Sequence, residues 1–545
     1  MKAYFKLYFI TFLFILFIAT SSINAQKKGL NEIKLVNLKS TVEFLASDEM
    51  KGRKTGEAEN NIAALYLASE AAKIGLKPLN DNGSYLQPYQ LTRTSLIRDS
   101  CRISLDQAGI KTMLSAQSII VTPLPNSDLS IEGQVIFGGY GIYSPEDDYY
   151  DLKNIDVKDK ILMIMDRAPT LPDGKTALLK DKKWMKSANM DAKLSNLLSL
   201  RPKTIIFVLD PKSGHNSIEE IIPDATEFMS EQFSISGIQN LADIFRNSIP
   251  RIIIIPQAMA DSILRPAGVN LKALQAKIDS TMKPQSMEIP LTTLRLHIQV
   301  IKEQIKAYNV AGLIEGSNIN DKKDAIIYTA HFDHIGLDSK GIPNNGADDN
   351  ASGTAALIEI AKAFKSEQKN IKRSIIILWV SGEELGLMGS KYYTEKPLFP
   401  LGNTLADINL DMIGRSWTSE DTGIVKGEQL DVKKGDSVYA AGGKDCSEIL
   451  RLNENAAKQL NMQIDYAYNS PNDTKGMYYR SDHYNFAQKK IPVIFYTTGI
   501  HKDYHSPGDI PAKLDYIKME KVTKLAFLLG YEIATTKNRL ANDKY

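Results

Sequence analysis

A set of acidic and imidazole side chains in the C-terminal half of the chain is suited to binding metal ions. Its members are His331, Asp349, Glu384, Asp411 and His505. They supply nitrogen and oxygen ligands without sulfur, which suits zinc in a hydrolytic site, with cobalt or manganese as substitutes. A catalytic zinc usually keeps three protein ligands and an open position for water, so five ligands are too many for one ion. Two zinc ions that share one carboxylate fit the set better.

Asp349 is the candidate for the shared ligand. Each ion then has three protein ligands, with the shared acid counted twice, and the two ions lie roughly 3.5 to 4 Å apart with a water or hydroxide between them. Glu383 stands beside Glu384 and is not needed as a ligand. It is therefore free to act as the general base that takes a proton from this water.

Four apolar runs must bring these side chains together. They span residues 325–330, 372–380, 405–410 and 491–496. Each run is typical of a buried strand, and each is followed by an acid or a histidine. Open α/β sheets place their ligand sites at the carboxyl ends of the strands. We therefore expect the candidate ligands to meet at one edge of an α/β sheet.

Two adjacent acids, Asp348 and Asp349, precede a predicted amphipathic helix. The apolar face of this helix consists of Ala356, Leu357, Ile360, Ala361 and Phe364. Taken alone, the acids are equally consistent with capping of the helix and compensation of its dipole. The acids and histidines after the other strands favour metal binding.

Five motifs carry a resemblance to a known family. They are HFD (331–333), GADDNASG (346–353), EELGLMGS (383–390), NLDMIG (409–414) and YHSPGD (504–509). In this order they resemble the M28 family of zinc peptidases, which includes bacterial aminopeptidases and relatives of glutamate carboxypeptidase. The resemblance implies a three-layer α/β/α domain with a central mixed sheet that acts on peptide substrates.

The resemblance also implies a role for each side chain. One metal would be held by His331 and Asp411, the other by Glu384 and His505, and Asp349 would bridge them. Glu383 would activate the water, and Asp333 would be an outer partner that fixes the tautomer of His331. In this family the peptide bond after the bridging acid, here Asp349 to Asn350, is typically cis.

Other polar residues near the motifs are less well defined. A segment like 478–483 lines the cleft in the family, so Tyr478 or Tyr479 is a candidate donor to the developing oxyanion. Packing of this aromatic pair on the sheet is the competing interpretation. We do not expect His334 or His501 to be ligands, because the family pattern places the first ligand at the start of HFD and the second region reads as a loop.

At 545 residues, the chain is too long for one ordinary core. Residues 1–25 have the basic start, short apolar core and small residues of a signal peptide. We expect residues 26–114 and 301–545 to form the peptidase domain. Residues 115–300 resemble, in their spaced strands, the β-rich protease-associated (PA) domain that M28 peptidases often carry as an insert.

The loop 48–56 (DEMKGRKTG) separates two predicted helices, 37–47 and 57–74. It resembles the loop with which exported members of the family open their peptidase domain. We assign no catalytic role to Arg53 in this loop.

Composition excludes several classes of partner. The formal net charge is +2, from 66 basic and 64 acidic residues, and no basic block stands out. We therefore expect no nucleic-acid partner. After removal of the signal peptide we expect no stable membrane association and a periplasmic or secreted location. The sequence leaves open the oligomeric state and the pairing of Cys101 with Cys446.

The sequence thus predicts an exported dinuclear-zinc exopeptidase, with an aminopeptidase favoured. A carboxypeptidase of the glutamate-carboxypeptidase type has the same metal centre and differs in pocket residues. A glutaminyl cyclase-like acyltransferase uses a related scaffold with one zinc, and a catalytically dead binding protein of the transferrin-receptor type should have lost ligands. The complete set of five ligands disfavours these last two alternatives.

Overall fold

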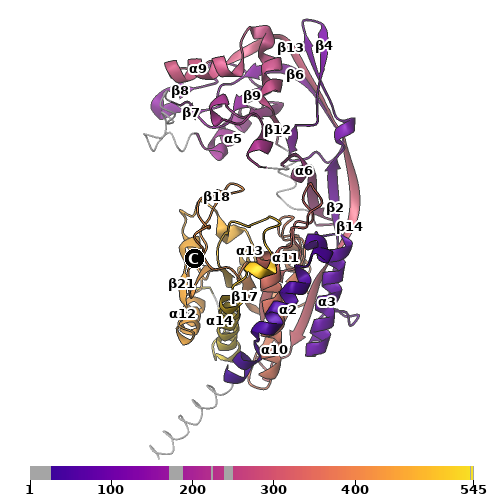
Figure 1. Cartoon of the computed structure of the whole chain (residues 1–545), viewed down its shortest axis with the longest axis vertical. Helices are drawn as coiled ribbons and strands as arrows, with labels where there is room; N and C mark the ends of the chain where they lie inside the picture. The colour runs from indigo at the N-terminus through magenta and orange to yellow at the C-terminus, as the bar shows by residue number, and fades with distance from the viewer. Residues whose placement is uncertain (1–25, 171–187, 223–224, 239–248, 541, 544–545) are drawn as a thin grey trace, which may run out of the picture. The chain divides into compact units, whose positions relative to one another are not determined.

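The computed structural model describes residues 26–170, 188–222, 225–238, 249–540 and 542–543. The chain divides into two compact units, one made of Met1–Leu91 with Ile305–Tyr545 and the other of Thr92–Gln304. It leaves the first unit within β2 (Leu86–Leu96) and returns within β14 (Val300–Ile314) (Figure 1). Residues 92–114 therefore belong to the second unit, whereas the sequence placed this boundary at 114/115. The predicted signal peptide, 1–25, lies outside the described residues.

A mixed sheet forms the centre of the first unit. From β14 onward its strands follow the order β14, β16 (Ser374–Val380), β15 (Ala325–His331), β17 (Thr404–Leu410), β22 (Val493–Thr497), β20 (Ser437–Gly442) and β21 (Gln463–Asp465). The strands β16, β15, β17 and β22 are parallel, whereas β14 is antiparallel to β16 and β20 is antiparallel to β22. These parallel strands are the four predicted apolar runs, so their carboxyl ends lie at one edge of the sheet.

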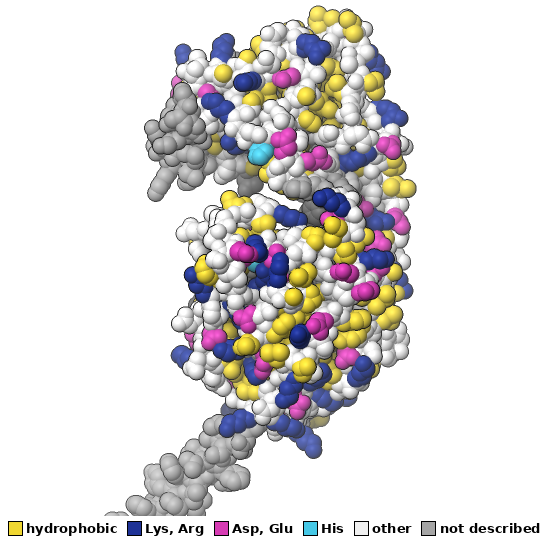
Figure 2. Space-filling view, viewed as in Figure 1, with side chains coloured by type: hydrophobic (Ala, Val, Ile, Leu, Met, Phe, Trp, Pro, Cys, Tyr) yellow, Lys and Arg dark blue, Asp and Glu magenta, His cyan; other side chains and the backbone are white. Residues whose placement is uncertain are grey.

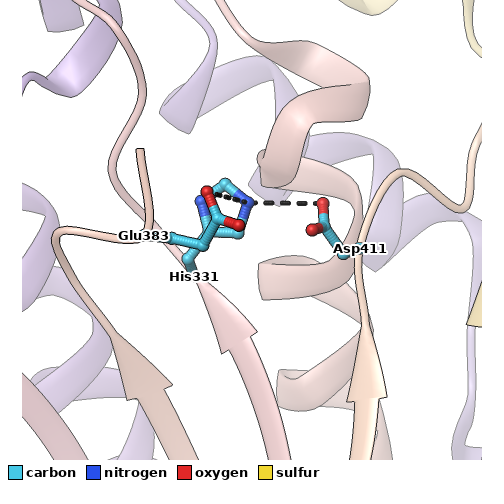
Figure 3. A group of neighbouring side chains, drawn as sticks. All are labelled: His331, Glu383 and Asp411. Carbon is cyan, nitrogen blue, oxygen red and sulfur yellow. Dashed lines mark hydrogen bonds and ion pairs between the residues drawn. The ribbon is translucent and has the colours of Figure 1, made fainter. Parts of the chain in front are cut away.

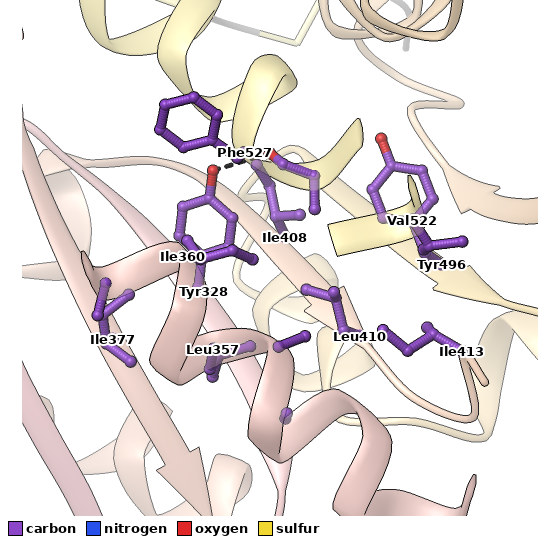
Figure 4. Packing of buried hydrophobic residues seen from close by; sticks show 14 of the residues in the cluster. Tyr328, Leu357, Ile360, Ile377, Ile408, Leu410, Ile413, Tyr496, Val522 and Phe527 are labelled. Atoms are coloured by element: carbon purple, nitrogen blue, oxygen red, sulfur yellow. Dashed lines mark hydrogen bonds between the residues drawn. The ribbon is translucent and has the colours of Figure 1, made fainter. Parts of the chain in front are cut away.

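Helices cover both faces of this sheet, which confirms the predicted three-layer α/β/α arrangement. One face packs against α2 (Leu35–Leu45), α3 (Ala58–Ile74), α10 (Gly353–Ser366), α12 (Ser447–Gln459) and α14 (Tyr516–Thr535). The other face packs against α11 (Met388–Glu395) and α13 (His483–Gln488). Figure 4 shows the first of these layers, where Leu357 and Ile360 of α10 and Phe527 of α14 lie close to sheet residues.

The helix that follows the paired acids, α10, is buried on more sides than its amphipathic pattern predicts. Nearly all of its residues from Gly353 to Phe364 are buried, because α2, α3 and α14 pack around it as well as the sheet. Even Glu359 is buried, and it accepts a hydrogen bond from the main-chain N–H of Lys34 (2.8 Å). The amino end of α10 is thereby held rigidly beneath the carboxyl edge of the sheet.

The second unit contains an eight-stranded sheet of its own. The strand order is β4 (Ile110–Leu114), β3 (Arg102–Gln107), β13 (Met287–Ile298), β6 (Leu129–Phe137), β9 (Ile161–Met165), β10 (Thr204–Val208), β12 (Arg251–Ile255) and β5 (Ile120–Thr122). One face packs on α8 (Gln257–Leu264) and α9 (Leu271–Thr281), and the other packs on α5 (Met190–Ser199). The unit therefore has its own core.

Both cysteines are buried and unpaired: Cys101 belongs to the second unit and Cys446 to the first. On the face seen in Figure 2, basic and acidic side chains of the first unit are interspersed. Within the described residues, no helix combines the length and the apolar character needed to cross a bilayer.

Candidate metal centre

The predicted ligands converge at the carboxyl edge of the parallel strands. His331 is the last residue of β15, and Asp411 follows β17 directly. Glu383 and Glu384 lie in the turn after β16, and His505 lies in the loop after β22. Each side chain reaches this edge because a buried strand ends beside it. The spacing of apolar runs therefore predicted the meeting point correctly.

The fifth predicted ligand, Asp349, comes from the turn before α10. Residues Ala347–Ser352 form a widened helical turn in which Asp349 and Asn350 depart from helical geometry. The peptide bond between these two residues is cis, as the resemblance implied. Neither acid caps the helix, because the N–H of Gly353 at the start of α10 is accepted by Asn350 Oδ1 (2.8 Å) and Asp348 Oδ1 accepts the Gly414 N–H instead. The capping interpretation of the paired acids is thus wrong.

One group of side chains surrounds the imidazole of His331 (Figure 3). His331 Nε2 lies 3.3 Å from Asp411 Oδ1, 3.4 Å from Asp349 Oδ1 and 4.0 Å from Glu383 Oε2. His331, Glu383 and Asp411 can each direct one ligand atom to a common point.

A second group surrounds His505. His505 Nε2 lies 3.1 Å from Asp349 Oδ2 and 3.1 Å from Glu384 Oε2. The two carboxylate oxygens of Asp349 therefore face different histidines. This is the arrangement that a shared ligand requires.

These two groups fit metal ions of the expected kind. Ligand atoms about 2.0 to 2.2 Å from a tetrahedral zinc are separated from one another by about 3.3 to 3.6 Å. The observed separations of 3.1 to 3.4 Å between the histidine nitrogens and the carboxylate oxygens of Asp349, Glu384 and Asp411 are close to that range. Imidazole and carboxylate ligands also match the chemistry of zinc. His331, Asp349, Glu384, Asp411 and His505 could thus hold a metal pair.

Burial makes the acidic cluster costly without a cation. Burial raises the pKa of Glu383 well above its usual range and raises that of Asp411, with His331 opposing both shifts. Burial acts in the same direction on Asp349, but hydrogen bonds from His331 and His505 hold its pKa well below the usual range. Three carboxylates in one buried site repel one another, and a bound cation relieves that repulsion.

Asp333 lies behind His331, where the resemblance implied an outer partner. His331 Nδ1 is 3.3 Å from the carbonyl oxygen of Asp333 and 3.6 Å from its Oδ1. The carboxylate also accepts hydrogen bonds from the Thr55 hydroxyl (2.9 Å) and from the Glu383 N–H (3.3 Å). Asp333 thus links the ring of His331 to the turn that carries Glu383.

Two further polar residues lie at the centre. From the sequence, His334 was excluded as a ligand and Ser481 was not singled out, yet His334 can direct a ligand atom to a common point with Asp349 and Glu384. His334 Nδ1 lies 2.8 Å from Glu384 Oε1 and 3.8 Å from Asp349 Oδ2. Ser481 donates to Asp411 Oδ2 (2.7 Å) and accepts from Asn409 Nδ2 (2.7 Å). The sequence shows His334 next to Asp333, but it does not show where the imidazole of His334 points. Both side chains orient a carboxylate of the predicted set.

The other paired acid, Asp348, faces away from both groups. Its Oδ1 accepts the Gly414 N–H (2.6 Å), and its Oδ2 lies 3.5 Å from His501 Nε2. Asp509 accepts the main-chain N–H of Asp348 (2.9 Å) and of Asp349 (3.1 Å). The imidazole of His501 thus contacts Asp348 in the turn before α10. This position agrees with its exclusion from the ligand set.

A pocket opens beside the two groups, and it is lined by Tyr504 rather than by Tyr478 or Tyr479. The Tyr478 ring packs edge-on against His483 with its centre 3.8 Å from Lys444 Nζ, and Tyr479 is 56% exposed. The competing interpretation of Tyr478, an aromatic that packs, therefore describes its position better.

Tyr504 precedes His505 and stacks on its ring at 3.8 Å between centroids. Its hydroxyl accepts a hydrogen bond from Arg480 Nη2 (3.3 Å), and Arg480 Nη1 pairs with Glu428 Oε1 (2.8 Å). Burial raises the pKa of Tyr504 well above its usual range, so the hydroxyl keeps its proton at neutral pH. One indication in the sequence that Tyr504 lies at the site is its position next to the candidate ligand His505.

Comparison with known families gives a match to one part of the chain. Residues 309–529 match the family model described as peptidase family M28. Aminopeptidase YwaD of Bacillus subtilis (strain 168) is 34% identical over 113 residues, which cover 20% of this chain and 22% of the relative. A probable leucine aminopeptidase of Arthroderma benhamiae is 26% identical over 246 residues, covering 44% of this chain and 60% of the relative. The chain thus spans less than two thirds of these relatives.

Among solved structures, an aminopeptidase from Aneurinibacillus sp. strain AM-1 aligns over 95% of this chain and 97% of that chain. The TM-score is 0.54 at 16% sequence identity. A likeness at this identity supports the fold.

Proposed function

We propose, from the match of residues 309–529 to the model of peptidase family M28, that this segment belongs to the family and that the protein is an exported exopeptidase with two zinc ions, specifically an aminopeptidase. The observation that carries the proposal is the orientation of Asp349. Its Oδ1 faces His331 at 3.4 Å and its Oδ2 faces His505 at 3.1 Å. A carboxylate placed between two imidazoles in this way suits a bridge between two metal ions.

Glu383 is the proposed proton carrier of the reaction. Metal ions held in the centre would supply Lewis-acid activation of a water and of the scissile carbonyl. Glu383 lines the pocket, and its Oε2 is 4.0 Å from His331 Nε2. From this position its carboxylate accepts the proton of the attacking water and later donates it to the leaving amine.

Tyr504 is the proposed donor to the oxyanion that forms on the carbonyl carbon. Tyr504 lines the pocket, and Arg480, which lines it too, donates a hydrogen bond to the Tyr504 hydroxyl oxygen (3.3 Å). The hydroxyl hydrogen is then left to point toward the substrate. A fixed donor of this kind stabilises a developing negative charge without reorganisation during the reaction.

Tyr504→Phe should lower kcat by about 100-fold, since it removes one oxyanion donor while keeping the ring on His505. KM and zinc content should stay near the wild-type values. Steady-state kinetics with metal analysis check this. Tyr479→Phe serves as the comparison. A larger loss of kcat in that variant would make Tyr479, and not Tyr504, the donor to the oxyanion.

The pocket favours a substrate with an apolar side chain at the end that is cleaved. Its walls include Met412, Met477, Phe495 and Ile500. The guanidinium of Arg480 is also at the pocket, where it could attract a substrate carboxylate and support the carboxypeptidase alternative. Glu428 already pairs with this guanidinium at 2.8 Å. A carboxylate substrate would have to displace that partner, so we favour the aminopeptidase.

A panel of short peptides tests the proposal. The zinc-loaded protein should cleave Leu- and Met-initiated peptides with a free amine, and it should spare the same peptides after N-acetylation. Amidation of the C-terminus should have little effect. Cleavage that requires a free carboxylate instead would establish the carboxypeptidase, and cyclisation of N-terminal glutamine without hydrolysis would establish the acyltransferase.

Two parts of the proposal rest on sequence pattern alone. Export to the periplasm or the medium is inferred from residues 1–25. Residues 115–300, which lie within the unit Thr92–Gln304, are proposed to be a PA-like insert that positions substrate. N-terminal sequencing of the mature protein from the host tests the first, because a start at Gln26 is expected.

A further inference from the structure

Arg53 is a fully buried arginine whose described hydrogen bonds all go to main-chain oxygens. Its Nε donates to Phe332 O (2.9 Å). Its Nη1 donates to Leu45 O (2.5 Å) and Asn345 O (2.6 Å), and its Nη2 donates to Gly346 O (3.0 Å). Removing a guanidinium from water costs free energy, which only such compensating hydrogen bonds offset. A surface loop would not need this arrangement.

The carbonyls that Arg53 binds belong to segments that carry candidate metal ligands. Phe332 follows His331 directly, and residues 345–346 lead into Asp349. A single side chain therefore ties the ligand at the end of β15 to the ligand before α10. The bond to Leu45 anchors this clamp to the last residue of α2.

The main chain of the same loop holds these segments as well. Arg53 O accepts the His334 N–H (3.3 Å), and Gly52 O accepts the Gly336 N–H (3.1 Å). A Cβ on Gly52 would lie 2.4 Å from Asn344 O, so only glycine permits this approach. Arg53 has a φ of 46°, in the left-handed region that non-glycine residues adopt only when their surroundings enforce it. The loop 48–56 is thus held in one conformation beside the metal centre.

Arg53 also brings a positive charge to an acidic cluster. The carboxylates that act on it electrostatically are those of Asp333, Asp349, Asp509 and Glu384. Burial lowers the pKa of Arg53 to about 10 against their influence, so the guanidinium stays charged at neutral pH. Its charge partly offsets the repulsion among these carboxylates.

We propose that Arg53 is a positioning residue of the metal centre, which sets the spacing between the segments that carry His331 and Asp349. The proposal rests on the metal-dependent function proposed above. Lysine cannot take this part, because its ammonium offers three donors from one atom, whereas guanidinium presents five in a planar fork. The role involves no contact with substrate.

Arg53→Lys tests this role, and the chain offers a matched control in Arg373→Lys. Arg373 is also buried at the amino end of β16, and its guanidinium donates to the carbonyls of Ile533 (2.8 Å), Thr536 (2.8 Å) and Asn538 (3.1 Å). The two substitutions make the same chemical change in a clamp on carbonyls. Only the side chain of Arg53 binds carbonyls in segments that carry candidate metal ligands.

The measurements are zinc affinity, by competition with a chromogenic chelator, and the visible absorption spectrum of the cobalt-loaded protein. Arg53→Lys should weaken zinc binding by about tenfold or more and alter the cobalt spectrum, whereas Arg373→Lys should bind zinc within about twofold of the wild type. Thermal melting of both variants reports the loss of stability that any buried clamp would cause.

Wild-type zinc affinity and an unchanged cobalt spectrum in Arg53→Lys would overturn the proposal. If that variant does not fold, Arg53→Gln, which retains two N–H donors, is held to the same criterion. A wild-type protein that binds no zinc contradicts the proposed function itself. That failure is seen before any variant is made, so it is distinguishable from failure of the role of Arg53.

Discussion

Glu383→Gln leaves the metal centre loaded and lowers kcat by about 1,000-fold, because an amide cannot accept the proton of the attacking water. The side chain keeps its volume, and none of the five predicted ligands is altered. Zinc content measured by atomic absorption should equal that of the wild type, and kcat should be measured on the preferred peptide of the panel.

Glu359→Gln is the matched control for this change. Glu359 is a buried glutamate of α10 that accepts hydrogen bonds from Lys34 N and Asn37 Nδ2, away from the pocket. Its substitution should affect stability and leave kcat near the wild-type value. A Glu383→Gln protein that retains more than about a tenth of wild-type kcat would remove Glu383 from the role of base.

Asp349→Asn should release at least one zinc ion from the purified protein and abolish turnover. The reason is that Asp349 faces both histidines, so its loss weakens both groups at once. Zinc binding stabilises the folded state, so chelation should lower the melting temperature of the wild type clearly and that of the variant little. Metal analysis and thermal melting with and without chelator measure the two effects.

Asp348→Asn provides the comparison from the adjacent position. Asp348 accepts the Gly414 N–H through Oδ1, and an asparagine preserves that oxygen. This variant should keep its zinc and a melting temperature that responds to chelation. Two zinc ions bound to Asp349→Asn, or their loss from Asp348→Asn alone, would move the bridging role to the neighbouring acid.

The elements beneath the site could be predicted because their signals are local. The runs before His331, Asp411 and His505 are largely apolar and short, and runs of this kind are typical of buried strands. Parallel strands then bring their carboxyl ends to one edge. Apolar runs and the residues that follow them thus predicted where the ligands meet.

Other features depended on contacts between distant parts of the chain. The boundary of the second unit falls within β2 and β14, whose patterns continue across it without interruption. The burial of α10 on several sides follows from α2, α3 and α14, which its own sequence does not encode. The choice of Tyr504 over Tyr478 required the direction of each ring relative to the pocket.

The sequence by itself determined the types of ligand, the strands that deliver them and the chemistry that imidazole and carboxylate can perform. The tertiary structure alone decided where His334 points, that Tyr504 lines the pocket, and that Arg53 is buried behind the centre. The physical reason is the separation along the chain between the residues that interact. Strand and helix patterns arise from neighbours along the chain, whereas the direction of a buried polar side chain is set by partners that lie tens or hundreds of residues away.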